Sequence, residues 1–526
     1  MKKFFIALSF LFLTENIVAQ GNFSGDLMTN VNFFNRDTSI GASGNPLYDN
    51  YLSGGESWLS LRYSQNGFTG TVRFDGFQNS NLLNPTSAYT GAGLGMFSLS
   101  KEYKGLTVTA GHIYDQIGSG ILFRAYEDRG LLIDNAVFGL QLKVKMAENI
   151  NMRAFTGQIR KQFERYAPIV KGINFEADYS LGKNVNMTSG FGALNRTMDQ
   201  SSMDAVVATI NGYDSTKRFT PKYNTYGATF YNTMNAGNFT WYAEAAIKSE
   251  EAIKDVQQNM INASGNVLYT TLGFSKGKIG INASVKRTEN FVMRTSPNEV
   301  LIRGLYNWQP IIANIRPQRL IARYSPQSQD VSEFAQTVNL FYTPNETKSF
   351  NLSYTHIDDL NQTKLYREIW GEFEYRGWEK WIAHIGAQYL EYNQELYQIK
   401  PGVPMFKSIT PFLELTYKIT ETQSIRTDLQ WMSTKQDYGA WVYALIEYNI
   451  APRWSFAIAD MYNYAPSGKH GDDKQHYPNL FVAYNKDAHR FTAQYVKQVE
   501  GINCTGGVCR FEPAFSGFKF GLTSTF

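Results

Sequence analysis

Apolar and polar residues alternate with a period of two along most of the chain. In "LSLRYSQNGFTGTVRFDG" the apolar residues Leu59 and Leu61 share one face before a turn at 65–67. Val72 and Phe74 continue that face after the turn. Successive side chains of a β-strand point to opposite faces, so this pattern predicts strands with one apolar and one polar face, joined by a tight hairpin.

The same hairpin signal recurs along the chain, and longer irregular segments separate the hairpins. We expect further short turns at residues 104–105, 147–149, 181–184, 235–238, 275–278, 343–348, 376–380, 419–423, 450–453 and 485–489. A regular succession of short turns and long loops is typical of outer-membrane barrels. The sequence therefore predicts an all-β fold, a transmembrane antiparallel up-and-down β-barrel of about 24 strands, within a range of about 22–26. Pro411 lies inside one expected strand, where it fits only at an edge or an irregularity.

The apolar faces of the strands favour a membrane over a soluble all-β fold. A soluble sandwich or propeller would need a second sheet to cover Trp241 and Ile247, or Trp381 and Ile385. Aromatic residues make up 15% of the chain, while its mean hydropathy is only −0.34. This composition suits a barrel in the cell outer membrane, where every second strand residue contacts lipid. We expect short turns and both termini in the periplasm and long loops outside the cell.

The first residues, "MKKFFIALSFLFLTENIVAQ", have the layout of a secretory signal peptide, with cleavage after Ala19. Their apolar core is too short to span a bilayer as a helix. We therefore expect residues 1–19 to be removed and residues 20–526 to form a single barrel domain. Strand alternation begins by Phe23. We thus expect no separate N-terminal plug domain, which favours passive over energised transport.

The last residues, "FKFGLTSTF", alternate up to a terminal Phe526. This strand resembles the C-terminal assembly signal of bacterial outer-membrane barrels, whose last residue is typically aromatic, and implies that the barrel assembly machinery recognises it. The segments "GSGILFRAYEDRGLLIDNAVFGL" and "GINCTGGVCRFEPAFSGFKFGL" are similar to an uncharacterised, porin-like barrel family of Bacteroidota outer membranes. That resemblance covers the mature chain and implies fold and location, with no activity.

A barrel of this size needs something to fill it. About 24 tilted strands give a backbone diameter of roughly 48 Å, wider than the lumen of general porins. Three long segments are candidates: 112–135, 195–222 and 289–333. The third is apolar and basic, and an exposed loop has little reason to be so apolar. We interpret it as an inward-folded, arginine-bearing constriction facing an acidic wall; the alternative is an external loop that binds a protein. The arginines are Arg303, Arg316, Arg319 and Arg323, and the carboxylates are Glu368, Glu372, Glu374, Glu414, Asp428 and Glu447.

Four charged residues crowd the segment "FRAYEDRG": Arg124, Glu127, Asp128 and Arg129. Paired charges of this kind narrow porin lumens and set a transverse field. An ion-paired knot that only pins the loop explains them equally well.

The sequence offers little for catalysis or metal binding. HExxH, P-loop and GxGxxG motifs are absent from the chain. "KHGDDKQH" places His470, Asp472, Asp473 and His476 together, but a solvated loop explains it better than a metal site. His356 with Asp358 and Asp359 has no accompanying serine that we can place. We therefore expect no enzyme activity and no cofactor. The net charge of +4 is too small and dispersed to indicate a nucleic-acid partner.

The two cysteines, Cys504 and Cys509, flank a Gly-Gly turn in the last expected external loop. In a secreted chain this spacing predicts a disulfide, worth about 2 kcal/mol for so small a ring. The alternative, a redox-active or metal-binding thiol pair, fits less well, because the spacing is wider than CxxC and no helix N-terminus is available to lower a thiol pKa.

Two functions remain open from the sequence. The first is porin-like, passive passage of hydrophilic solutes through a constricted lumen. The second is a non-conducting accessory barrel that binds a lipoprotein or a secretion or assembly machinery. In both cases outer-membrane lipids surround the barrel. Inward charges favour transport only slightly, because they need not conduct anything.

Overall fold

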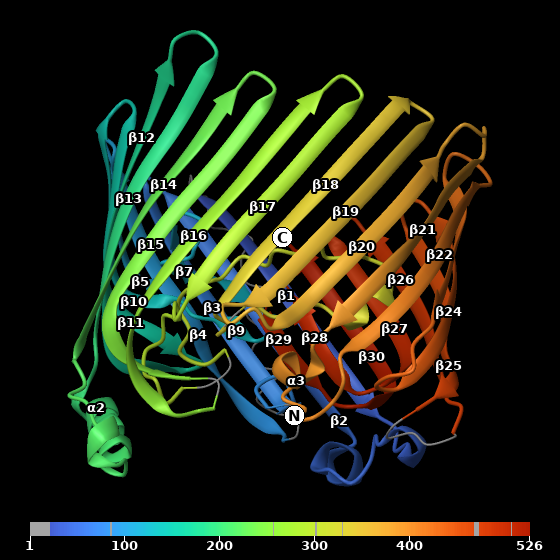
Figure 1. The fold of residues 1–526 in the computed structure, drawn as a ribbon, viewed down its shortest axis with the longest axis horizontal. Coiled ribbons are helices and arrows are strands. Elements are labelled where there is room, and N and C mark those ends of the chain that lie inside the picture. Colours follow the sequence, from blue (N-terminus) through green and yellow to red (C-terminus); the bar gives the residue numbers. More distant parts are fainter. Residues whose placement is uncertain are drawn as a thin grey trace.

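The computed structural model describes residues 21–84, 87–255, 257–299, 302–328, 330–467, 473–505 and 508–526, without the side chains of 502–510. The expected signal peptide, His470 and Asp472 lie outside the described residues. The chain forms a closed antiparallel barrel of 24 strands (Figure 1). These are β1 (Asn22–Phe34), β2 (Ser53–Gln65), β3 (Phe68–Ser80), β4 (Tyr89–Tyr103), β5 (Leu106–Ile113), β10 (Val137–Ala147), β11 (Ile150–Lys161), β12 (Glu164–Leu181), β13 (Val185–Thr197), β14 (Asn224–Ala236), β15 (Phe239–Lys254), β16 (Met260–Lys276), β17 (Ile279–Glu289), β18 (Glu333–Asn345), β19 (Lys348–Asp359), β20 (Lys364–Tyr375), β21 (Trp381–Tyr392), β22 (Phe406–Lys418), β23 (Gln423–Met432), β24 (Gly439–Ile450), β25 (Trp454–Pro466), β26 (His476–Lys486), β27 (His489–Gln498) and β30 (Phe515–Thr525).

Each wall strand pairs with the next wall strand along the chain, and β30 pairs with β1 to close the barrel. Shorter strands interrupt the order twice, so that β5 pairs with β10 and β27 pairs with β30. The predicted fold class and strand number are confirmed. No helix in the described part of the chain is long and apolar enough to cross a membrane.

The two faces of the strands have the predicted chemistry. On β3, Phe68 and Phe74 point outward and are each 49% exposed, while Arg73 and Asp75 on either side of Phe74 point inward and are buried. Trp241 and Ile247 on β15 are likewise exposed on the outer surface. An exposed apolar face of this kind is stable only against lipid.

Short turns gather at one rim of the barrel, at the top in Figure 1, and most long loops at the other. Asn66 and Gly67 have φ values of 51° and 75°, the left-handed backbone that a two-residue hairpin turn needs. The predicted short turns lie between consecutive strands as expected. Residues 162–163 are an exception at the opposite rim: β12 is 18 residues long, so this hairpin extends as strand where we expected an irregular loop.

Pro411 occupies an interruption in the ladder, as its missing N–H requires. It pairs with Ala387 on β21, but regular pairing of β22 with β23 begins only at Phe412. Beyond Pro411 a single bridge joins Ile409 to Ser433, the residue that follows β23.

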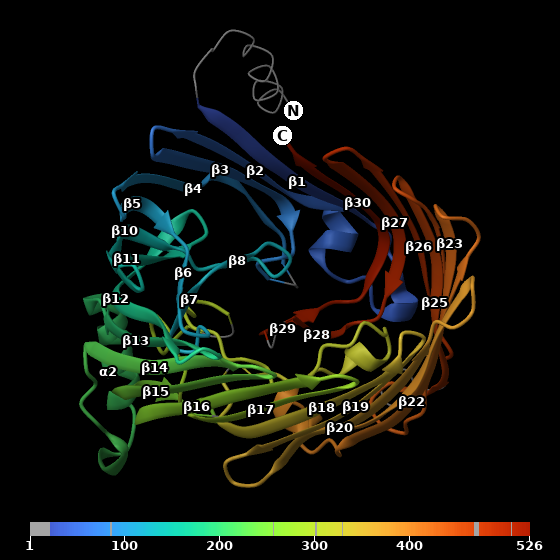
Figure 2. The same cartoon turned by 90° about the horizontal axis from the view of Figure 1, so that it is seen from above.

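Several segments turn into the barrel from the long-loop rim. Figure 2 shows β6–β8 and the β28–β29 hairpin inside the ring of strands. The inward elements are β6 (Asp115–Ile117), β7 (Phe123–Ala125), β8 (Glu127–Asp128), β9 (Ile133–Asp134), η5 (Ile321–Arg323), β28 (Gly501–Thr505) and β29 (Val508–Glu512), while η2 (Thr38–Ile40) and η3 (Leu47–Tyr51) lie at the long-loop rim (Figure 1). Their apolar residues, among them Leu47, Phe123, Tyr306 and Leu320, form two buried clusters with inward-facing strand residues.

The segment 198–223 behaves differently from the other long segments. Its helix α2 (Gln200–Asn211) lies outside the barrel ring (Figures 1 and 2). Met203, Val206 and Ile210 on one side of α2 pack on the ends of β15 and β16 in a separate apolar cluster. The helix thus buries its own apolar side without entering the lumen. The remaining short helices are η4 (Ser215–Lys217) and α3 (Gln394–Tyr397).

Candidate site in the barrel lumen

The segment between β17 and β18 is attached to the barrel wall along its first half. Three buried cations of the wall donate to its backbone carbonyls: Arg196 to Thr295 (3.2 Å), Lys248 to Val292 (3.0 Å) and Lys286 to Pro310 (2.7 Å). Glu251 pairs with Arg196 and Lys248, and Glu333 pairs with Lys286. Because these charges are neutralised and hydrogen-bonded, they can be buried and hold the segment in place.

This first half also joins the other inward segment, which lies between β5 and β10. Arg124 donates its backbone N–H to the carbonyl of Tyr306, and Trp308 donates to that of Gly120, both at 2.9 Å. The Asn135 amide donates to the carbonyls of Arg124 and Leu305. The two segments are therefore one body fixed to one side of the wall.

The second half of the segment reaches the neighbouring strands β19 and β20 of the wall through Arg316. Its guanidinium donates to the Ser353 hydroxyl (2.6 Å) and to Glu368 (3.4 Å), and it stacks on the Trp370 ring at 3.9 Å. The Arg316 and Glu368 side chains are 9% and 1% exposed. Arg316 is thus a neutralised anchor.

Arg319 and Arg323 lie one turn further along and have different surroundings. Arg323 lies over the Trp441 ring at 4.7 Å. Arg319 is exposed to solvent, although the barrel encloses the segment that carries it. Desolvation inside the barrel lowers the pKa of Arg319, and the positive charge of Arg323 lowers it further. Water therefore reaches this part of the segment from within the barrel.

The remaining charges expected in the constriction are mostly engaged elsewhere. The Arg303 side chain is exposed, and within the described residues it has no carboxylate partner; its carbonyl accepts a bond from Arg294. Glu368, Glu372 and Glu374 all lie on β20, spaced so that they share its inward face with the buried Trp370. Of the three, Glu368 contacts an arginine of the segment. The other carboxylates use partners on their own or neighbouring strands: Glu372 with His384, Glu374 with Arg376, Glu414 and Glu447 with Arg426, and Asp428 with Gln430.

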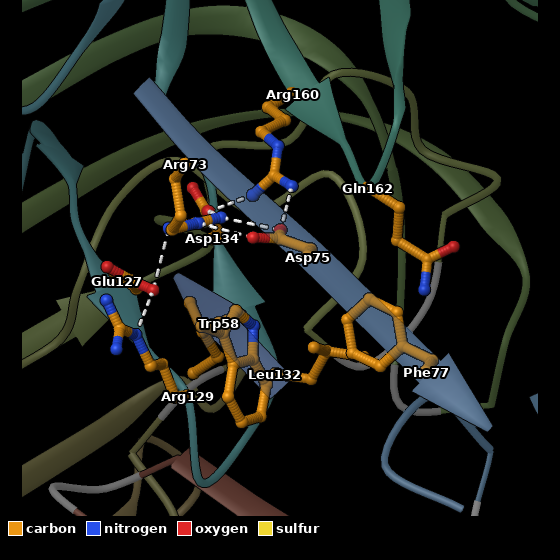
Figure 3. A pocket seen from close by; sticks show the side chains of 11 residues that line it. Trp58, Arg73, Asp75, Phe77, Glu127, Arg129, Leu132, Asp134, Arg160 and Gln162 are labelled. Atoms are coloured by element: carbon orange, nitrogen blue, oxygen red, sulfur yellow. Dashed lines mark hydrogen bonds and ion pairs between the residues drawn. The ribbon is translucent and has the colours of Figure 1, made fainter. Parts of the chain in front are cut away.

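The segment between β5 and β10 enters an ionic network with the wall (Figure 3). Glu127 and Asp134 of the segment both pair with Arg73, and Asp134 also pairs with Arg160. Asp75 bridges Arg73 and Arg160 from β3. The network lines a small internal cavity beside Trp58 and Phe77.

The four charged residues expected around 124–129 divide between different contacts. Arg129 joins the network through Glu127 (2.8 Å) and reaches Asp26 on β1 (3.0 Å). Arg124 instead stacks on Tyr126 and Trp308, and Asp128 accepts a bond from the backbone N–H of Leu131. These contacts attach the segment to the wall; whether they also act on passing ions stays a prediction.

Sequence reasoning missed the wall partners, chiefly Arg160 and Trp370. The alternation places Arg73 and Asp75, two residues apart, on the inward face of one strand, but their partners are on other strands or in the inward segment. Because a buried charge needs a partner, such inward charges indicate that an ion-pair network is present.

Backbone pairing gives the positions of the cysteine pair and of the terminal phenylalanine. Cys504 and Cys509 are register partners in the β28–β29 hairpin. Phe526 exchanges two backbone hydrogen bonds with Gly25 on β1, and its ring is 46% exposed. Gly25 leaves the space that this ring occupies, since a Cβ there would be 2.6 Å from it.

Histidines and carboxylates do not gather into a metal site in the described residues. His476 pairs with Asp460 at 2.5 Å, and His356 pairs with Asp358 at 2.8 Å. Asp358 also binds Arg367, so this neighbourhood forms an ion-pair chain at the rim.

Solved structures with a similar fold are large barrels. The P pilus usher (PapC) translocation pore matches at 11% identity and a TM-score of 0.45, over 96% of this chain and 99% of that one. The P pilus tip assembly intermediate PapC-PapD-PapK-PapG of E. coli matches at 12% and 0.49, over 98% and 62%. The siderophore receptor PirA of Pseudomonas aeruginosa matches at 8% and 0.42, over 96% and 80%. At these identities the likeness concerns the fold alone.

Comparison with other protein sequences identifies a family and no activity. No curated protein matches the chain. One family model, described as a family of unknown function (DUF6029), matches residues 1–526.

Proposed function

We propose that this chain, which belongs to the family of unknown function DUF6029, is an outer-membrane channel for the passive passage of small hydrophilic solutes. The barrel's apolar outer face and its two unequal rims support the location, and its polar inner face supports an aqueous lumen. In this proposal the inward segments narrow the lumen, short turns face the periplasm, and the barrel assembly machinery recognises the strand that ends at Phe526.

One observation carries the proposal: the inward segment is attached to the barrel wall and is still exposed to water. Arg316 fixes it to β20, while Ile315 and Arg319, on either side of Arg316 in the chain, are exposed. Ile315 is 62% exposed, an unusual state for an isoleucine enclosed by a barrel. A segment that filled the lumen completely would bury this side chain, so the exposed residues support a narrowed aqueous path.

A cysteine in place of Ile315 tests the proposal directly. The Ile315→Cys variant, with Cys504 and Cys509 replaced by serine, is reconstituted in planar bilayers and treated with a charged thiol reagent. We expect the unmodified channel to conduct, and the reagent to reduce its current, because the added group lies in the path. Ser215→Cys, in the external loop, is the matched control and should be modified without a change in current.

Two results would count against a channel of this kind. If the thiol of the Ile315→Cys variant is modified, as mass spectrometry can show, and the current is unchanged, the segment lies off the path. If the folded barrel never conducts and instead co-purifies with a stoichiometric lipoprotein or a component of a secretion machinery, the accessory role replaces transport.

A further inference from the structure

The turn around η5 holds two arginines side by side. Ala322 donates its backbone N–H to the carbonyl of Gln318 (2.9 Å), and Arg323 donates to that of Leu320 (3.3 Å), so the chain forms one helical turn. Arg319 and Arg323 are both part of this turn, and they are close enough that the charge of Arg323 acts on Arg319.

The turn is held firmly between wall residues. The backbone N–H of Leu320 donates to Gln430 on β23 at 2.7 Å, and the hydroxyl of Tyr324 donates to Asp437 at 2.8 Å. The Tyr324 ring also stacks on Phe406, with the centroids 3.8 Å apart. The backbone that carries the two arginines is consequently held in one position.

Neither arginine forms an ion pair within the described part of the chain. The charge of Glu512 acts on Arg319 from a distance, and Arg323 contacts the rings of Tyr324, Tyr438 and Trp441 and the hydroxyl of Tyr324. The buried Nε of Arg323 has no hydrogen-bond partner. The carboxylates nearby accept bonds from other groups: Asp437 from Lys400 and Tyr324, Glu500 from Tyr438, and Glu512 from Gln498.

This arrangement differs from that of Arg316, whose charge Glu368 compensates. Two like charges this close repel each other unless something compensates them. An oxyanion offers that compensation, since guanidinium groups bind carboxylate and phosphate through paired charge-assisted hydrogen bonds. The solvent exposure of Arg319 gives such a solute access from the lumen.

We propose that Arg319 and Arg323 form a binding site for anionic solutes that carry carboxylate or phosphate groups, and that this site makes the lumen anion-selective. The inference rests on the proposed channel function. Arg316 is then a positioning residue for the pair, and Trp441 supports Arg323 without neutralising it.

Reversal potentials in a KCl gradient and block of the current by citrate test the site. The wild-type channel should prefer chloride over potassium, and citrate and inorganic phosphate should block it. The Arg319→Gln/Arg323→Gln variant should lose this preference and bind citrate roughly tenfold more weakly, because charge-assisted hydrogen bonds are lost. Arg319→Lys/Arg323→Lys keeps both charges and should retain the chloride preference.

Lys143→Gln is the matched control. Lys143 is an exposed cation two residues beyond the inward-facing Gln141 on β10, so this variant removes a lumen charge elsewhere. We expect only a small shift in the reversal potential for it.

The outcomes distinguish failure of the anion-binding site from failure of the channel proposal. A wild type that conducts without anion preference, or a double Gln variant identical to it, overturns the site while the channel stands. If the barrel does not conduct, the channel proposal fails, and calorimetric titration of the folded, detergent-solubilised protein with citrate decides the site. Binding that requires Arg319 and Arg323 supports it, and no binding overturns it.

Discussion

The guanidinium carbon of Arg316 lies 3.9 Å from the centroid of the Trp370 ring. Trp370 stacks in turn on Phe412, with an interplanar angle of 17°. Arg316 belongs to the segment after β17, while Trp370 and Phe412 belong to β20 and β22 of the wall. This stack therefore attaches the second half of the inward segment to the strands that follow β18 in the wall.

Replacing Arg316 should destabilise the protein through the carboxylate that it leaves behind. In Arg316→Met the buried Glu368 loses its cation and keeps the amide of Gln388 as a hydrogen-bond donor. Breaking one side of a buried ion pair costs about 3–5 kcal/mol. Adding Glu368→Gln removes the unpaired charge and should recover most of the loss. Urea unfolding of the four proteins in detergent micelles measures this cycle, and a double variant no more stable than Arg316→Met would contradict it.

The wall of the barrel was predictable because each strand carries its own signal. Phe68, Val72 and Phe74 indicate the lipid face of β3 by period-two alternation, and Asn66–Gly67 indicate its turn. These signals are local in sequence, so the number and order of strands follow from reading hairpins one after another.

The contacts inside the barrel depend on residues that are distant in sequence. Arg316 was expected to face several carboxylates, but among the described residues it pairs with Glu368, while Glu372 and Glu374 pair with His384 and Arg376. Which of several inward charges meet is fixed by register across many strands and by the path of the loop. Neither has a local signal, so the sequence indicated the residue types at the site but not their pairing.

The network around Asp134 should control the order of the segment between β5 and β10. Asp134→Asn removes the carboxylate that binds Arg73 and Arg160 at once, and leaves two buried cations close together. We expect faster hydrogen exchange across residues 114–136, while the wall strands stay protected because their ladders are intact. Asp178→Asn is the control, since Asp178 is exposed and bonds to Thr188. If residues 114–136 exchange at the same rate in wild type and in Asp134→Asn, the network does not hold the segment.

The orientation of the barrel predicts which turns a label can reach. Single cysteines at Gly67, Gly277 and Lys486, in a chain lacking Cys504 and Cys509, should resist a membrane-impermeant thiol reagent in intact cells, because the proposed orientation places these short turns in the periplasm. Ser215→Cys, in the long loop after α2, should react. Permeabilised cells should label at all four sites, which confirms that the cysteines are accessible. Reaction at Gly67, Gly277 or Lys486 in intact cells would reverse the orientation.

A disulfide between Cys504 and Cys509 is the last prediction. The two residues are directly opposite each other in the β28–β29 hairpin, and facing positions of antiparallel strands have Cα separations of about 4.5–5.5 Å, within the range that a disulfide spans. Non-reducing mass spectrometry of protein from freshly prepared membranes should therefore detect the linked peptides. Replacing both cysteines by serine should leave the barrel folded, because the ring is small and strand pairing around the wall supplies most of the stability; its loss should cost about 2 kcal/mol or less. Free thiols in the fresh preparation would rule the disulfide out, and a barrel that fails to fold without them would show that the hairpin matters for assembly.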